Sequence, residues 1–137
     1  MNKNEAIRLL NKKGYKTTGR RLDILNFFQD EDRYRTAKDL IDHMEINYPG
    51  ISFDTVYRNL HLYNDIGILE STEFNGEKQF RMKCSHDHHH HFICNKCGKT
   101  TEIDVCPMDE AIHILSDYTV ENHKFEIYGI CPLCQTA

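Results

Sequence analysis

The stretch SFDTVYRNLHLYNDIGILESTEFNGEKQFRM, residues 52–82, combines a helical pattern with a hairpin pattern. An apolar stripe runs along its first half at Phe53, Val56, Leu60 and Tyr63. Ser52 is placed to cap the start of this helix, and Gly67 is placed to end it. Two strand-like runs then flank Asn75-Gly76, a dipeptide typical of a two-residue hairpin turn. The stretch therefore predicts a helix followed directly by a β-hairpin.

Three more helical patterns precede this stretch, in residues 4–14, 17–30 and 36–48. The third begins at Thr36, a residue suited to the N-cap, and directs Leu40, Ile41 and Met44 inward. Helices followed by a hairpin are the order of a winged helix-turn-helix. In that architecture the last helix enters the major groove of DNA, and the hairpin lies over the backbone.

The predicted reading helix carries polar side chains opposite its apolar stripe. Thr55, Arg58 and Asn59 follow the spacing i, i+3, i+4, so they share one face. Arginine can pair with guanine and asparagine with adenine, while Tyr57 can touch phosphate or a thymine methyl. The candidate DNA-contacting residues are Lys16, Arg20, Ser52, Thr55, Tyr57, Arg58 and Asn59. The alternative is an ordinary exposed helix face.

Charge is distributed unevenly along the 137 residues, although the net charge is only −4. Residues 1–29 carry seven Lys/Arg against two Asp/Glu, a net +5, and residues 84–137 carry three against eight, a net −5. Such asymmetry is expected when one end of a chain meets phosphate and the other does not. The charge pattern thus favours a nucleic-acid contact in the first half.

The chain after Cys84 is predicted to be mostly β. Strands are expected in residues 88–94, 99–105 and 124–130, with one helix in 107–118 that begins at Pro107 and turns Ile112 and Leu115 toward the sheet. So few large apolar side chains make a poor independent core, so we expect a metal, a second subunit or both to complete it. The predicted fold class is α+β: a winged-helix domain in residues 1–83, with its wing hairpin at about 68–83, and a small α/β dimerisation domain in 84–137.

Four of the six cysteines form two C-x2-C pairs, Cys94 with Cys97 and Cys131 with Cys134, separated by 33 residues. Two such pairs supply a closed tetrahedral four-cysteine shell, the usual form of a structural zinc site. A redox dithiol would need a thioredoxin-like context that is missing, and iron–sulfur clusters use other spacings. The pattern predicts structural zinc.

The stretch CSHDHHHHFICNKCG, residues 84–98, holds further potential ligands. On a strand, His89 and His91 share one face and His88 and His90 share the other, so the run divides into two half-sites. Cys84 is the soft candidate for completing one half-site. Asp109 and His123 are candidates for the other. A solvated polar strand is the alternative, whereas a purification tag is unlike an interior run.

The motifs KTTGRR (16–21), FDTVYRNL (53–60), HHHHFICNKCG (88–98) and EIYGICPLC (126–134) together resemble the ferric-uptake-regulator (Fur) family of metal-sensing repressors. Among its branches the chain looks most like the zinc-uptake regulators. The resemblance implies a homodimer that binds an inverted repeat in AT-rich DNA. It also implies a regulatory zinc site at Glu70, Cys84, His89 and His91. A second regulatory site is implied at His88, His90, Asp109 and His123, for which Cys106 and His86 lie near in the sequence as substitutes.

Ligand softness favours zinc as the regulatory metal, because the thiolate of Cys84 suits zinc better than iron(II) or manganese(II). We therefore expect a cytoplasmic, zinc-responsive repressor of zinc-uptake genes, with one structural and one or two regulatory zinc ions per chain. No membrane segment, secretory signal, small-molecule substrate or catalytic residue is expected. The other reading of Cys84 is a small buried core cysteine.

Other functions stay open at this stage. Within the same family, an iron, nickel, manganese or peroxide sensor would share most of these motifs. A zinc storage or delivery protein would explain the ligands but not the winged-helix half. A zinc hydrolase would need an open coordination position with a carboxylate base, and the H-E-x-x-H pattern is absent from the sequence.

Overall fold

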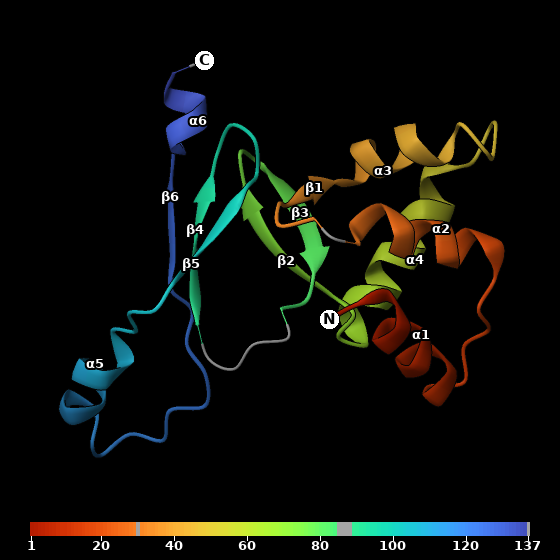
Figure 1. Cartoon of the computed structure of the whole chain (residues 1–137). Coiled ribbons are helices and arrows are strands. Elements are labelled where there is room, and N and C mark those ends of the chain that lie inside the picture. The colour runs from red at the N-terminus through yellow and green to blue at the C-terminus, as the bar shows by residue number, and fades with distance from the viewer. Residues whose placement is uncertain (30, 85–88, 137) are drawn as a thin grey trace. The chain divides into compact units, whose positions relative to one another are not determined.

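The computed structural model describes residues 1–29, 31–84 and 89–136 of the chain. The chain divides into two compact units, Met1–Ser85 and His86–Ala137 (Figure 1). The first unit holds the helices and one three-stranded sheet, and the second holds the other three-stranded sheet. The predicted α+β fold class is confirmed.

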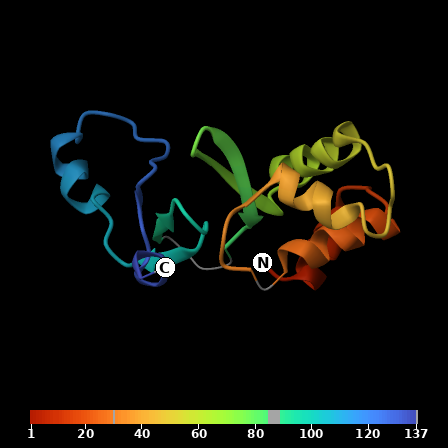
Figure 2. The same cartoon turned by 90° about the horizontal axis from the view of Figure 1, so that it is seen from above.

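Four helices form most of the first unit: α1 (Lys3–Lys12), α2 (Gly19–Phe28), α3 (Ala37–Met44) and α4 (Phe53–Asp65) (Figures 1 and 2). The two predicted N-caps are confirmed. The Thr36 hydroxyl accepts from the backbone N–H of Asp39 at 3.1 Å and forms a reciprocal capping box with that residue. The Ser52 hydroxyl accepts from the backbone N–H of Thr55 at 3.2 Å, which fixes the start of the predicted reading helix.

The predicted hairpin follows α4 as β2 (Leu69–Phe74) and β3 (Glu77–Met82). Its turn places Asn75 at φ 53° and Gly76 at φ 78°. Two consecutive positive φ angles are the requirement of a type I′ turn, which is why Asn-Gly occurs there. A short strand, β1 (Arg35–Thr36), pairs with β3 and gives the order β1-β3-β2. This strand was not predicted, because two residues show no periodicity.

Apolar side chains from all four helices and from the hairpin form one core in the first unit. Its buried members are Ala6, Leu10, Ile24, Leu25, Phe28, Leu40, Met44, Val56, Leu60, Tyr63, Ile68, Leu69, Phe80 and Met82. One predicted member was wrong: Phe53 is 54% exposed. It occupies the first position of α4, ahead of the buried turns, and stacks on Tyr57 with ring centroids 5.2 Å apart.

The second unit is built on β4 (His90–Cys94), β5 (Thr100–Ile103) and β6 (Glu126–Gly129). The central strand β4 pairs antiparallel with β5 and parallel with β6. Two short helices, α5 (Met108–Ile114) and α6 (Pro132–Gln135), complete it, and the second was not predicted. The prediction that Ile112 faces the sheet was wrong, since Ile112 is 45% exposed and α5 has no buried residue.

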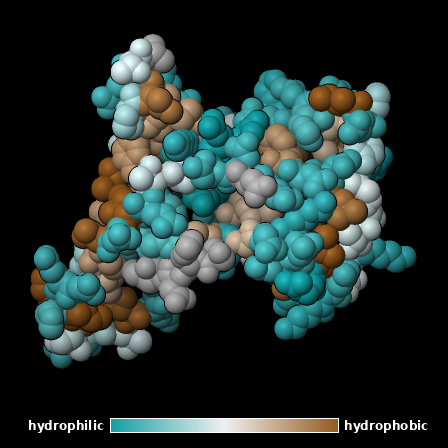
Figure 3. Space-filling view, viewed as in Figure 1, coloured by the Kyte–Doolittle hydropathy of each residue, from teal (hydrophilic) through white to brown (hydrophobic). Residues whose placement is uncertain are grey.

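Few side chains are buried among the described residues of the second unit. They are Ile93, Cys94 and Cys131, with the polar His90 and Thr100. Large apolar side chains instead lie at its surface, near α5 and along β6 (Figure 3). Among the described residues of the whole chain, no helix combines the length and the apolar character needed to cross a membrane.

Candidate metal centres and nucleic-acid interface

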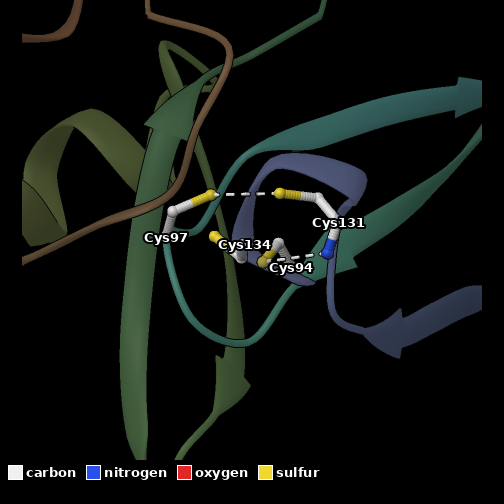
Figure 4. A group of neighbouring side chains, drawn as sticks. All are labelled: Cys94, Cys97, Cys131 and Cys134. Carbon is white, nitrogen blue, oxygen red and sulfur yellow. Dashed lines mark hydrogen bonds between the residues drawn. The ribbon is translucent and has the colours of Figure 1, made fainter. Parts of the chain in front are cut away.

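Four cysteine sulfurs meet where the turn after β4 approaches the end of β6 (Figure 4). Cys94 ends β4 and Cys97 lies in the turn that follows it. Cys131 caps α6, and Pro132 begins that helix, so one helical turn brings Cys134 back toward Cys131. The four sulfurs all lie within 4.8 Å of one another. The two C-x2-C pairs therefore form a single cluster.

The cluster has the dimensions of a tetrahedral zinc shell. The sulfurs of Cys97 and Cys131 are 3.8 Å apart. With zinc–sulfur bonds of about 2.3 Å, two sulfurs of a tetrahedral site lie about 3.8 Å apart. The backbone N–H of Cys131 also donates to the sulfur of Cys94 at 3.4 Å. Such N–H donors stabilise a thiolate, so the residues present fit a closed four-thiolate metal site.

The protonation of the four thiols is uneven. Burial raises the pKa of Cys94, but N–H donors of Cys131, Cys97 and Lys96 outweigh burial and bring this pKa down to about 6. Hydrogen bonding to Cys131, together with burial, raises the pKa of Cys134 to about 12. Four adjacent thiols do not all ionise on their own, because each thiolate opposes the next. A bound dication removes that opposition, since coordinated thiols lose their protons.

A second group lies on one face of the sheet in the same unit. The Nε2 atoms of His89 and His91 are 3.1 Å apart, and a carboxylate oxygen of Glu102 lies 3.8 Å from Nε2 of His89. Glu102 pairs with His91 across β4 and β5, which places both side chains on the same face. The alternation that predicted His89 with His91 thus also accounts for Glu102. The sequence analysis did not name Glu102.

The other two residues expected at this site lie in the first unit. Cys84 is partly buried and is the last described residue before the histidine run. Glu70 lies on β2 opposite Arg81 of β3, and its carboxylate Oε1 is 3.3 Å from Nε of Arg81. Arg81 is buried, so in this structure the Glu70 charge is directed at a guanidinium within its own sheet.

A third group lies on the opposite face of β4. Nε2 of His90 is 3.3 Å from the sulfur of Cys106, and Nε2 of His123 is 3.5 Å from the same sulfur. Of the residues expected here, the structure brings together His90 and His123, and His88 lies outside the described residues. Asp109 does not join this group, and Cys106 takes part instead.

The first unit presents a basic hollow of about 420 Å³ beside α4. Its lining includes four of the predicted DNA-contacting residues, Lys16, Arg20, Thr55 and Asn59. A neighbouring hollow of about 300 Å³ adds Arg58. Of the remaining predicted residues, Ser52 caps α4, and Tyr57 stacks between Phe53 and His61 rather than lining either hollow.

Arg21 was missed as a member of this surface, although it lines both hollows. Its Nε donates to the side-chain oxygen of Asn59 at 3.4 Å, and one of its terminal nitrogens donates to the carbonyl of Lys16 at 2.7 Å. Its own carbonyl accepts from the Tyr63 hydroxyl at 2.9 Å. Arg21 thus ties the start of α2 to the exposed face of α4. The KTTGRR motif was the signal that could have identified it.

Comparison with known proteins decides the family. The model of the ferric uptake regulator family matches residues 12–128, most of the chain. The chain belongs to the ferric uptake regulator family. Fur-family proteins are metal-responsive transcription regulators rather than enzymes; they bind DNA and form dimers.

Individual members of the Fur family agree over nearly the full length. The ferric uptake regulation protein of Staphylococcus epidermidis is 52% identical over 135 residues, 98% of each chain. The solved Vibrio cholerae ferric uptake regulator is 30% identical with a TM-score of 0.70, covering 91% of this chain and 98% of that one. A zinc uptake regulator solved with zinc and DNA has a TM-score of 0.73 at 22% identity, covering 98% and 93%, and shows the shared fold.

Proposed function

We propose that this Fur-family chain is a zinc-responsive repressor of zinc-uptake genes, with zinc as the corepressor. The observation that carries the proposal is the convergence of His89 and His91, with Nε2 atoms 3.1 Å apart. Two imidazoles of a tetrahedral zinc ion lie about 3.3 Å apart, given Zn–N bonds of about 2.0–2.1 Å. Cys84 stands five residues before His89 and supplies the thiolate that favours zinc over iron(II) or manganese(II).

The proposed regulatory site takes Cys84, His89 and His91, together with a carboxylate. Glu70 is the carboxylate that the family resemblance implies. Glu102 is supported by its position 3.8 Å from His89, which makes it the competing ligand for the same ion. A second zinc ion, held by the four-cysteine cluster, has a structural role because a closed shell leaves no position for exchange with substrate.

The proposed mechanism is the ordering of two DNA-binding surfaces. Cys84 ends the first unit, and His89 and His91 belong to the second. A zinc ion bound by residues of both would limit how the units move. In a homodimer this limits the spacing of two α4 helices, so that both can enter successive major grooves of an inverted repeat. The exposed apolar side chains of the second unit, among them Ile127 and Ile130, suit the dimer contact.

Iron(II) is the second candidate, favoured by the name of the Staphylococcus epidermidis relative at 52% identity. Two imidazoles and the Glu102 carboxylate also form a donor set that suits iron(II). The two metals differ in their need for sulfur: zinc uses the Cys84 thiolate, whereas iron(II) prefers the nitrogen and oxygen donors.

The deciding experiment is metal-dependent recovery of DNA. Purified protein, stripped of weakly bound metal, is mixed with fragmented DNA from its source organism at buffered free zinc, iron(II), manganese(II) or nickel(II). Retained fragments are sequenced. Zinc-dependent recovery of a few AT-rich inverted repeats is expected. Recovery with iron(II) alone would replace zinc by iron, and no selective recovery under any metal would overturn the regulator proposal.

A further inference from the structure

Two imidazoles and one thiol converge from three separate segments of the second unit. His90 comes from β4, Cys106 precedes α5 and His123 precedes β6. Both Nε2 atoms point at the same sulfur, at 3.3 Å and 3.5 Å, and all three potential ligand atoms lie within 4.8 Å of one another. In a tetrahedral zinc site, a sulfur and a nitrogen ligand lie about 3.6 Å apart. The observed spacing is within a few tenths of an ångström of that value.

We propose that His90, Cys106 and His123 bind a third zinc ion through one thiolate and two imidazoles. This donor set differs from the one that the family resemblance implies, which places Asp109 at the site. A thiolate in place of a carboxylate moves the preference of the site toward zinc and away from iron(II) and manganese(II). Three protein ligands leave one tetrahedral position for water or another donor.

The three side chains are arranged so that an ion can reach a site whose innermost ligand is already oriented. His90 is 7% exposed, and the ring of Phe125 meets it edge to face at 90° with centroids 5.4 Å apart. Cys106 is partly buried and His123 is exposed. A buried, oriented imidazole reduces the ordering cost of binding. The exposed His123 lies on the side from which metal enters.

A thiol–imidazole hydrogen bond is the competing explanation of the same geometry. One S–H can donate to only one of the two imidazoles, so the other must donate its own N–H to the sulfur. Such an arrangement would be a structural contact without metal. The two explanations differ in what happens when metal is added, since coordination consumes the thiol proton and a hydrogen bond does not.

Cobalt(II) is the probe, because bound thiolate gives it a sulfur-to-metal charge-transfer absorption. The test uses the full chain carrying Cys84→Ala, with the four-cysteine cluster left loaded with zinc. This background removes the other regulatory thiolate. It is compared with the same protein carrying in addition Cys106→Ser, His123→Ala or Asp109→Asn, each checked for folding by circular dichroism. Bound metal is counted by mass spectrometry of the elements.

The Cys84→Ala protein is expected to bind cobalt(II) with a charge-transfer band and to keep it with Asp109→Asn. Cys106→Ser should abolish the band and one equivalent of metal, and His123→Ala should weaken binding at least about tenfold, the order seen when metal-site partners are lost. A band unchanged by Cys106→Ser would overturn the proposal. Metal lost with Asp109→Asn but kept with Cys106→Ser would overturn it in favour of the carboxylate.

A second measurement needs no substitution. Alkylation of each cysteine in the unmodified chain is followed by peptide mass spectrometry with and without zinc, and zinc is expected to slow modification of Cys106 at least about tenfold. An unchanged rate would identify the hydrogen-bonded thiol instead. The inference rests on the proposed function only for the identity of the physiological metal. Metal counting and alkylation do not involve DNA, so failure of the regulator proposal would leave these readouts interpretable.

Discussion

The two units of this chain solve the problem of stability in different ways. The first buries a continuous set of aliphatic and aromatic side chains contributed by four helices and a hairpin. The second, among its described residues, buries mainly Ile93 with two cysteines, a histidine and a threonine. Burial of apolar area stabilises a fold without any cofactor, whereas polar ligands at the centre of a unit stabilise it only when they are coordinated. The difference predicts that metal and core substitutions act on different halves.

The largest effect is expected from Cys94→Ser. Structural zinc in small domains contributes about 10–16 kcal/mol of apparent binding free energy, which is also folding free energy. Losing one of the four thiolates should therefore unfold the second unit and leave the helices of the first unit intact. Hydrogen exchange followed by mass spectrometry checks this, with protection lost across β4 and retained across α4.

The matched control for Cys94→Ser is Cys84→Ala, which also removes one thiol but lies outside the four-cysteine cluster. It should leave protection across β4 in place. If Cys94→Ser kept the second unit protected and its zinc bound, the cluster would not be the element that holds this unit together.

The next effect is expected from Leu60→Ala in the first unit. Leu60 is fully buried on α4, and truncation of such a side chain costs about 2–5 kcal/mol of unfolding free energy. Denaturant unfolding followed by circular dichroism should show this loss in the helical transition. The zinc content of the second unit should not change, and a parallel loss of zinc would show that the two units do not stabilise themselves separately.

A smaller effect is expected on function from Cys84→Ala. Allosteric coupling is typically about 1–3 kcal/mol, or roughly 5- to 150-fold in affinity. The substitution should remove zinc-dependent tightening on operator DNA while leaving zinc-free affinity and the fold unchanged. Fluorescence anisotropy at two buffered zinc concentrations measures this. Undiminished zinc dependence would remove Cys84 from the regulatory site.

Glu70→Gln and Glu102→Gln form a matched pair for the same assay. Each removes one carboxylate charge without changing side-chain size. Only the true ligand should raise the zinc concentration needed for half-maximal DNA binding. The Glu70 variant additionally leaves Arg81 without its 3.3 Å partner, so its unfolding free energy must be measured beside its DNA affinity.

Local rules predicted most of the fold. Caps and turns depend on a few adjacent residues, so Thr36, Ser52 and the Asn75-Gly76 turn were predicted correctly. Burial at the ends of helices depends on what packs there, and helical periodicity carries no information about it. This is why Phe53 and Ile112 were placed inward and are exposed.

For the candidate site, strand alternation separated His89 and His91 from His90, and this follows from a single strand. Glu102 and Cys106 required knowledge of which segments lie beside that strand. Counting the β4–β5 hairpin outward from its turn places Glu102 opposite His91, so the sequence contained that pairing. The approach of Cys106 to His123, 17 residues away along the chain, depends on tertiary structure alone.

The smallest effect is expected from Thr36→Ala, which removes only a helix cap in the first unit. The Thr36 hydroxyl accepts from the N–H of Asp39, and the Asp39 carboxylate accepts in return from the N–H of Thr36 at 3.1 Å. Loss of such a cap costs about 0.5–2 kcal/mol. Thr36 also pairs with Gln79 of β3, so its backbone position is held by the wing. Thr36→Ser, which keeps the hydroxyl, should recover most of the unfolding free energy in the same denaturant titration. Equal losses for both variants would show that the methyl group, rather than the cap, stabilises this junction between wing and helix.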